Sequence, residues 1–158
     1  VGQPLVERIN AEGEKHGVKI VKGEDGATRI SVGGRLTGMP LIPPLNDEAA
    51  RLKWMDEAGI DVQLLAGWMD LAGYHLPTEA GQWLARAQNE TLADMAARRP
   101  DRYAAAAAVP LQDANAAADE LRHAVKVLGH RAVQIGARVE EEGLDAPQYD
   151  AFWSAAQE

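Results

Sequence analysis

The alternation of amphipathic helical segments with short apolar runs after residue 45 constrains the fold more than any other feature of this sequence. Apolar residues at helical spacing predict helices, and apolar runs bounded by Gly or Pro predict buried strands. The predicted helices cover 47–58, 78–99, 113–128 and 145–158, and the predicted strands cover 60–66, 103–109 and 132–136. Continuous apolar strands between amphipathic helices are typical of a parallel sheet covered on both faces, or of a barrel. The sequence therefore predicts an α/β protein.

Capping residues mark several boundaries of these helices. Asn46 and Asp47 are predicted to begin the first helix, and Gly59 is predicted to follow its end. Thr78 and Asp113 are the predicted caps of the next two helices. The pattern opens with a helix and closes inside another, so we expect a strand before it and a continuation after it.

Residues 1–45 have a different pattern and are predicted to form a separate unit from residues 46–158. Residues 1–13 carry apolar side chains at helical spacing. Two β-branched runs, at 18–21 and 28–32, flank a Gly- and Asp-rich turn and predict a β-hairpin. Residues 33–45 contain three glycines and three prolines and are predicted to be a loop.

Composition excludes several classes of partner. The chain of 158 residues has a formal net charge of −8 at pH 7, which argues against binding to nucleic acid and to an anionic membrane surface. It contains no cysteine, which fits a cytoplasmic protein. We find no apolar run of the roughly 18 residues that a membrane-spanning helix needs.

The four histidines do not have the local spacing of metal ligands, since none forms an H-x-H or H-E-x-x-H pair. His16, His123 and His130 are predicted to be structural or solvent-facing. His75 differs, because it follows the predicted strand 60–66 at the end where ligand sites of α/β proteins gather. It either lines a site or belongs to the structure of its loop.

Other candidates lie after the ends of the same strands. Trp68 and Tyr74, in the loop 67–77, either stack on a planar substrate or attach the loop to the sheet. Arg138, after the strand 132–136, faces either an anionic group or the carboxylates of residues 140–142, which are predicted to form a solvated loop.

Residues 55–63, MDEAGIDVQ, resemble the MDxxGVDVQ signature of the amidohydrolase-2 family, the group around aminocarboxymuconate-semialdehyde decarboxylase. Further segments agree with family motifs in order and spacing. They are GY at 73–74, NE at 89–90, RPDRY at 99–103, VPLQD at 109–113, QIG at 134–136, and LD at 144–145 with FW at 152–153. The resemblance covers residues 46–158 well and residues 1–45 weakly.

The resemblance implies a distorted (β/α)8 barrel that binds one divalent metal, usually zinc or manganese. Most members are non-oxidative decarboxylases of aromatic or unsaturated carboxylic acids, and others are hydrolases or hydratases. This chain would supply strands two to four with their helices, plus an N-terminal hairpin insertion. The family's metal-binding and catalytic positions have no counterpart here, so we expect the 158 residues alone to be inactive. The whole enzyme is expected to be a homodimer.

The resemblance also implies a substrate clamp in the insertion. Decarboxylase members bind the substrate carboxylate with an arginine after the hairpin, and Arg35 is the closest match by position. A guanidinium fork suits a carboxylate chemically. The alternative to this enzyme is a small α/β module that binds a partner without catalysis.

Overall fold

The predicted strands pair as a parallel sheet of order β4-β5-β6 in the computed structural model, which describes residues 2–41 and 47–158. The strands are β4 (Gln63–Leu65), β5 (Tyr103–Ala107) and β6 (Ala132–Val133). Leu65 pairs with Ala105, and Ala107 pairs with Val133. Each strand is shorter than the apolar run that predicted it, and the outer residues of each run lie in the flanking loops.

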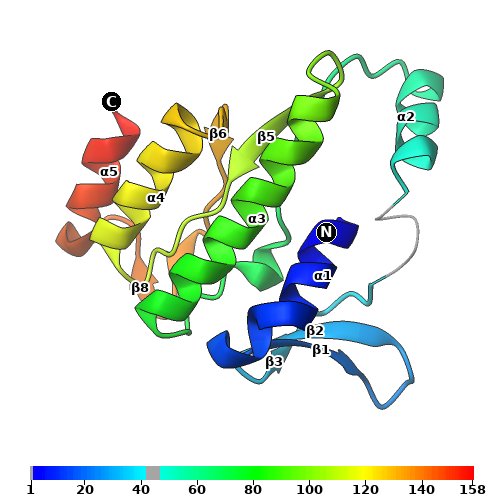
Figure 1. Cartoon of the computed structure of the whole chain (residues 1–158). Coiled ribbons are helices and arrows are strands. Elements are labelled where there is room, and N and C mark those ends of the chain that lie inside the picture. The colour runs from blue at the N-terminus through cyan, green and yellow to red at the C-terminus, as the bar shows by residue number, and fades with distance from the viewer. Residues whose placement is uncertain (1, 42–46) are drawn as a thin grey trace.

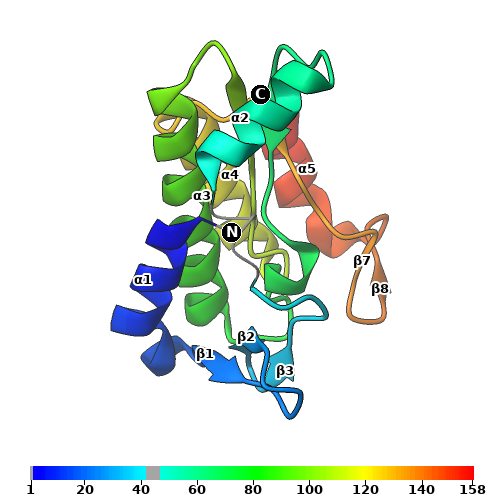
Figure 2. The same cartoon turned by 90° about the vertical axis from the view of Figure 1, so that its right-hand side faces the viewer.

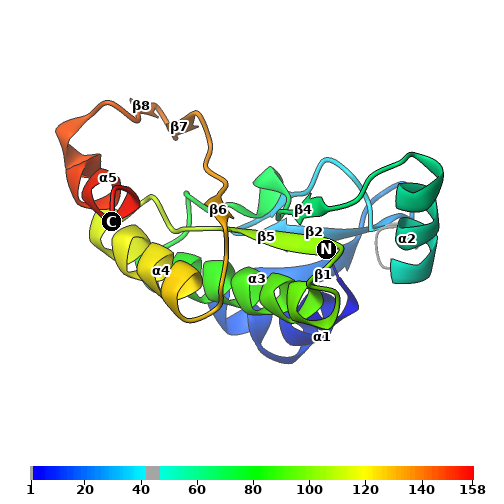
Figure 3. The ribbon, with the colours of Figure 1, turned by 90° about the horizontal axis from the view of Figure 1, so that it is seen from above.

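Helices cover one face of this sheet. This part of the chain forms α2 (Glu48–Glu57), α3 (Thr78–Arg98), α4 (Ala114–Lys126) and α5 (Asp150–Ala156), with 3-10 turns η3 (Met69–Leu71) and η4 (Pro147–Tyr149). Figure 3 shows α3 and α4 against the same side of the sheet. Leu64, on the other side of β4, is 52% exposed. Within the described ranges, therefore, no helix covers the second face of the sheet. Of the two predicted arrangements, a sheet covered on both faces and a barrel, the first is not observed in this part of the chain.

The predicted caps are confirmed at two helices and wrong at one. The Asp47 carboxylate accepts a hydrogen bond from the Ala50 N–H, and the Asp113 carboxylate accepts from Asn115 and Ala116. Thr78 is instead the first residue inside α3, because Pro77 takes the cap position and makes no side-chain bond there. Proline fits a helix entry, since it brings no N–H that would need a partner.

The N-terminal segment forms a helix and a three-stranded antiparallel sheet. The elements are α1 (Gln3–Glu12), η1 (Gly13–His16), β1 (Val18–Lys22), β2 (Thr28–Val32) and β3 (Arg35–Leu36). The prediction of a loop from residue 33 is wrong for β3. Gly33 and Gly34 both have positive φ, 55° and 86°, so they make a two-residue turn that pairs Val32 with Arg35. The predicted unit boundary at residues 45 and 46, Pro43, Pro44 and the Asn46 cap lie outside the described residues.

The hairpin lies under the N-terminal end of α3 and shares a core with it (Figures 1 and 2). This core joins residues from both predicted units: Leu5, Ile9, Val18, Ile30, Val32, Leu71, Leu76, Ala80, Leu84 and Ala87. A second cluster, between α4 and α5, is centred on the fully buried Phe152. The division of the chain into two units stays a prediction. No helix in the described part of the chain is long and apolar enough to cross a membrane.

The cap of α4 gives a test of this account. We expect Asp113→Ala to lower the free energy of unfolding by about 1 kcal/mol, because two N–H groups of the first turn lose their acceptor. Urea unfolding measures the change. Asp119→Ala, an exposed position on the same helix, is the control and should change stability by less than about 0.5 kcal/mol. Equal effects of the two substitutions would contradict the cap assignment.

Candidate functional site

Three loops meet at the carboxyl edge of the parallel sheet. The Gln112 amide, in the loop after β5, donates to the carbonyl oxygens of Gly73 and Leu76 in the loop after β4, at 3.3 and 3.2 Å. The Gly136 N–H, after β6, donates to the Tyr74 hydroxyl at 3.1 Å. Ligands of parallel α/β sheets bind at this edge, so these loops define the candidate site.

The N-terminal hairpin is attached to the same loops. The His75 Nε2 atom lies 2.8 Å from the Val32 carbonyl oxygen, and since that oxygen only accepts, Nε2 carries the proton. The Gly38 N–H donates to the Asp70 carboxylate at 2.6 Å. The hairpin therefore extends the edge of the site beyond the sheet.

Arg35 reaches the third loop. Its guanidinium donates to both carboxylate oxygens of Glu140, at 3.1 and 3.3 Å. This guanidinium lowers the pKa of the Glu140 carboxyl. Glu140 lies in the turn between two short antiparallel strands, β7 (Arg138–Val139) and β8 (Glu142–Gly143). Residues 140–142 are exposed as predicted, but they belong to this strand pair and not to an irregular loop.

The structure brings Arg35, Trp68, Tyr74 and His75 to this edge, each engaged with the protein itself. Trp68 is partly buried against the core under the hairpin. Tyr74 packs on the α4–α5 cluster, and burial raises the pKa of its phenol. Arg138 donates to the Glu141 carbonyl oxygen at 3.1 Å, so it faces the residues beside it. The side chains of Arg35 and Arg138 remain 63% and 62% exposed.

The site depends on two buried amides that analysis of the sequence did not single out as functional. The Gln88 amide donates to the Leu71 carbonyl oxygen at 3.0 Å, and the Asn89 amide bonds the backbone of Ala108. Both lie in the middle of α3 and are almost fully buried. Two successive amides in the middle of an amphipathic helix were the available signal, because amides that become buried need partners.

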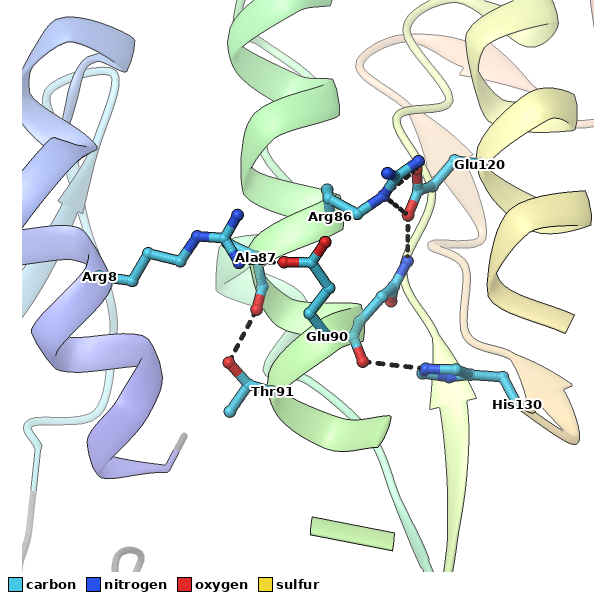
Figure 4. Close-up of polar contacts among 8 residues, drawn as sticks. Arg8, Arg86, Ala87, Glu90, Thr91, Glu120 and His130 are labelled. Atoms are coloured by element: carbon cyan, nitrogen blue, oxygen red, sulfur yellow. Dashed lines mark hydrogen bonds and ion pairs between the residues drawn. The ribbon is translucent and has the colours of Figure 1, made fainter. Parts of the chain in front are cut away.

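A buried charge lies behind Asn89. The Glu120 carboxylate is 5% exposed and accepts from Arg86 at 2.7 to 3.1 Å and from the Asn89 amide at 2.8 Å. Figure 4 shows Arg86, Glu120 and His130 around α3. The His130 Nε2 atom lies 3.0 Å from the backbone carbonyl oxygen of Asn89. Burial lowers the pKa of the His130 imidazole.

The described residues do not form a metal site. Between residues 2–41 and 47–158, no group of three or more His, Asp or Glu side chains is arranged to hold a metal ion. These residues alone therefore do not fit the divalent metal that the resemblance implies.

Comparison with known proteins identifies the class to which this sheet and its loops belong. A family model described as amidohydrolase matches residues 43–158, so the chain belongs to this family, as the resemblance predicted. Among particular relatives, the chain is 37% identical over 115 residues to gamma-resorcylate decarboxylase of Rhizobium radiobacter. That match covers 69% of this chain and 35% of the relative, so the matched part of the chain spans about a third of the relative's length.

Two solved structures are also similar. The 2,6-dihydroxybenzoate decarboxylase from Rhizobium matches with a TM-score of 0.63 and 34% identity, over 71% of this chain and 36% of that protein. A 5-carboxyvanillate decarboxylase from Novosphingobium aromaticivorans, solved with bound manganese, matches with a TM-score of 0.68 and 29% identity, over 72% of this chain and 33% of that protein. The relatives are thus decarboxylases of aromatic acids.

Protonation of His130 gives a prediction for pH. Because burial lowers its pKa below the ordinary 6.5, the unfolded chain binds this proton more readily than the folded chain. The stability that neutral His130 supports is complete above about pH 6.5 and is lost as the pH falls toward the folded-state pKa. We expect His130→Gln, which keeps a donor for Asn89, to reduce the fall in melting temperature between about pH 7.5 and 5.5.

His123→Gln, on a half-buried position of α4, is the control and should leave this pH dependence unchanged. The lowered carboxyl pKa of Glu140 acts below this window, since its ordinary value is already 4.5. An unchanged pH profile in His130→Gln would show that the buried imidazole does not govern it.

Proposed function

We propose that the protein to which this chain belongs is a metal-dependent, non-oxidative decarboxylase of a hydroxylated aromatic carboxylic acid. The observation that carries the proposal is the 37% identity to gamma-resorcylate decarboxylase over 115 residues. The convergence of the three loops at the carboxyl edge supports it, since the relatives share this part of the fold. A cytoplasmic location and a homodimeric state remain predictions.

We also propose that these residues form strands two to four of a (β/α)8 barrel, with the hairpin as an insertion. Support comes from α3 and α4 on one face of the sheet and from a match that covers 35% of the relative. Such barrels take about 250 residues, so the 158 residues alone are proposed to be inactive. The metal is proposed from the manganese in the related structure.

The chain's own residues are proposed to bind and orient the substrate. Arg35 binds the substrate carboxylate. Its bidentate contact with Glu140 supports this role, because it shows that the guanidinium can pair with a carboxylate at this position. Trp68 and Tyr74 form walls beside the planar ring, and His75 fixes the hairpin next to them. Arg138 supplies a second positive charge at this edge. The ring carbon that bears the carboxylate then takes a proton, and its bond to the carboxylate breaks to release carbon dioxide.

Turnover tests the function directly. We expect the whole protein, supplied with Mn²⁺ or Zn²⁺, to release carbon dioxide from 2,6-dihydroxybenzoate and to lose that activity with a chelator. Carbon dioxide release and loss of the acid measure the reaction. Binding of the acid without turnover under these conditions would favour the non-catalytic module instead.

Arg35→Ala tests the proposed clamp. We expect kcat/KM for the acid to fall by roughly ten- to a hundred-fold, because a charge-assisted bidentate contact is lost. Arg29→Ala is the matched control. Arg29 lies on the same hairpin, but its guanidinium pairs with Asp25 in the β1–β2 turn. Unchanged kcat/KM in Arg35→Ala would exclude the clamp.

A further inference from the structure

The backbone of Ala108 is held by a side chain at the point where the sheet ends. The last parallel pair of β5 joins Ala107 to Val133, and Ala108 follows at the carboxyl edge. The Asn89 carboxamide accepts from the Ala108 N–H at 2.7 Å and donates to the Ala108 carbonyl oxygen at 2.9 Å. One amide therefore satisfies both backbone groups of the first residue of the loop 108–113.

Glu120 fixes the orientation of this amide. The Asn89 Nδ2 atom also donates to the Glu120 carboxylate at 2.8 Å. A carboxylate only accepts, so the nitrogen of the amide must face Glu120, which leaves its oxygen for the Ala108 N–H. Arg86 holds Glu120 from the other side, and the carboxylate cannot turn away from Asn89 without losing these bonds.

A shift of Ala108 would reach the residues proposed to bind the substrate. Gln112 follows Ala108 by four residues, and its amide donates to the carbonyl oxygens of Gly73 and Leu76 in the loop after β4. That loop carries Tyr74 and His75. Gln112 lies directly against α3 as well, because a Cβ atom on Gly81 would come within 1.9 Å of its Nε2 atom.

We propose that Asn89 is a positioning residue that holds the loops of the ligand-binding edge in their binding geometry, and that Glu120 and Arg86 keep its amide correctly turned. This inference rests on the proposed decarboxylase function. Asn89 touches no substrate and acts through Ala108 and Gln112. A purely structural residue would affect stability alone, so the test must separate an effect on stability from an effect on substrate binding and turnover.

Asn89→Asp in the whole protein makes this separation. Asp is the same size and still accepts from the Ala108 N–H, but it loses both donors and faces the Glu120 carboxylate. We expect kcat/KM for 2,6-dihydroxybenzoate to fall by roughly ten- to a hundred-fold, with KM raised, at a temperature well below the unfolding midpoint.

Thr91→Val is the matched control. Thr91 is also buried on α3, but its hydroxyl donates to the Ala87 carbonyl oxygen of the same helix and touches no loop (Figure 4). It should lower the melting temperature and leave kcat and KM unchanged. If Asn89→Asp, compared at the same folded fraction, alters kcat/KM no more than Thr91→Val, the positioning role is overturned.

Hydrogen exchange gives an independent measurement. In Glu120→Gln, the new amide lets Asn89 turn over, so we expect faster exchange of the Ala108 N–H than in the unaltered protein or in Thr91→Val. Glu120→Gln also tests the positioning role of Asn89 if Asn89→Asp fails to fold. Unchanged exchange overturns the inference, as does faster exchange with unchanged kcat/KM. If the unaltered protein shows no decarboxylation, the proposed function fails, while exchange still decides whether Glu120 orients Asn89 against Ala108.

Discussion

The candidate site depends most on the pair of hydrogen bonds between the Asn89 amide and the backbone of Ala108. A parallel strand that ends inside a protein leaves buried N–H and C=O groups, and each costs free energy unless it finds a partner. Asn89 supplies both partners, so the chain can leave the sheet at a fixed point. Gln88, one position earlier on α3, donates to the Leu71 carbonyl oxygen in the neighbouring loop.

The same arrangement explains why α4 carries a buried carboxylate. Burial of a lone charge costs several kcal/mol, yet Glu120 is compensated by the Arg86 guanidinium and the Asn89 amide. An apolar residue in its place would free the Asn89 amide to reverse. The charge therefore contributes orientation more than stability, and it joins α3 and α4 behind the loops that they support.

Local signals predicted much of the fold. The helix–strand alternation gave the parallel strands, and the caps Asp47 and Asp113 begin their helices as expected. The ends of the strands were not predictable, since they depend on ladder partners elsewhere in the chain. In the site, the Arg35–Glu140 pair joins residues 105 apart, and no local pattern encodes it. The role of Asn89 likewise depends on a contact across two elements.

The central proposal about function is that a substrate binds against the three loops at the carboxyl edge of β4, β5 and β6. A crystal structure of the whole protein with 4-hydroxy-3-methoxy-5-nitrobenzoate, the acid bound in the similar carboxyvanillate decarboxylase structure, tests it most directly. The account predicts the ring beside Trp68 and Tyr74, and the carboxylate within reach of Arg35. A ligand bound at the opposite edge of the sheet, with these loops untouched, would contradict it.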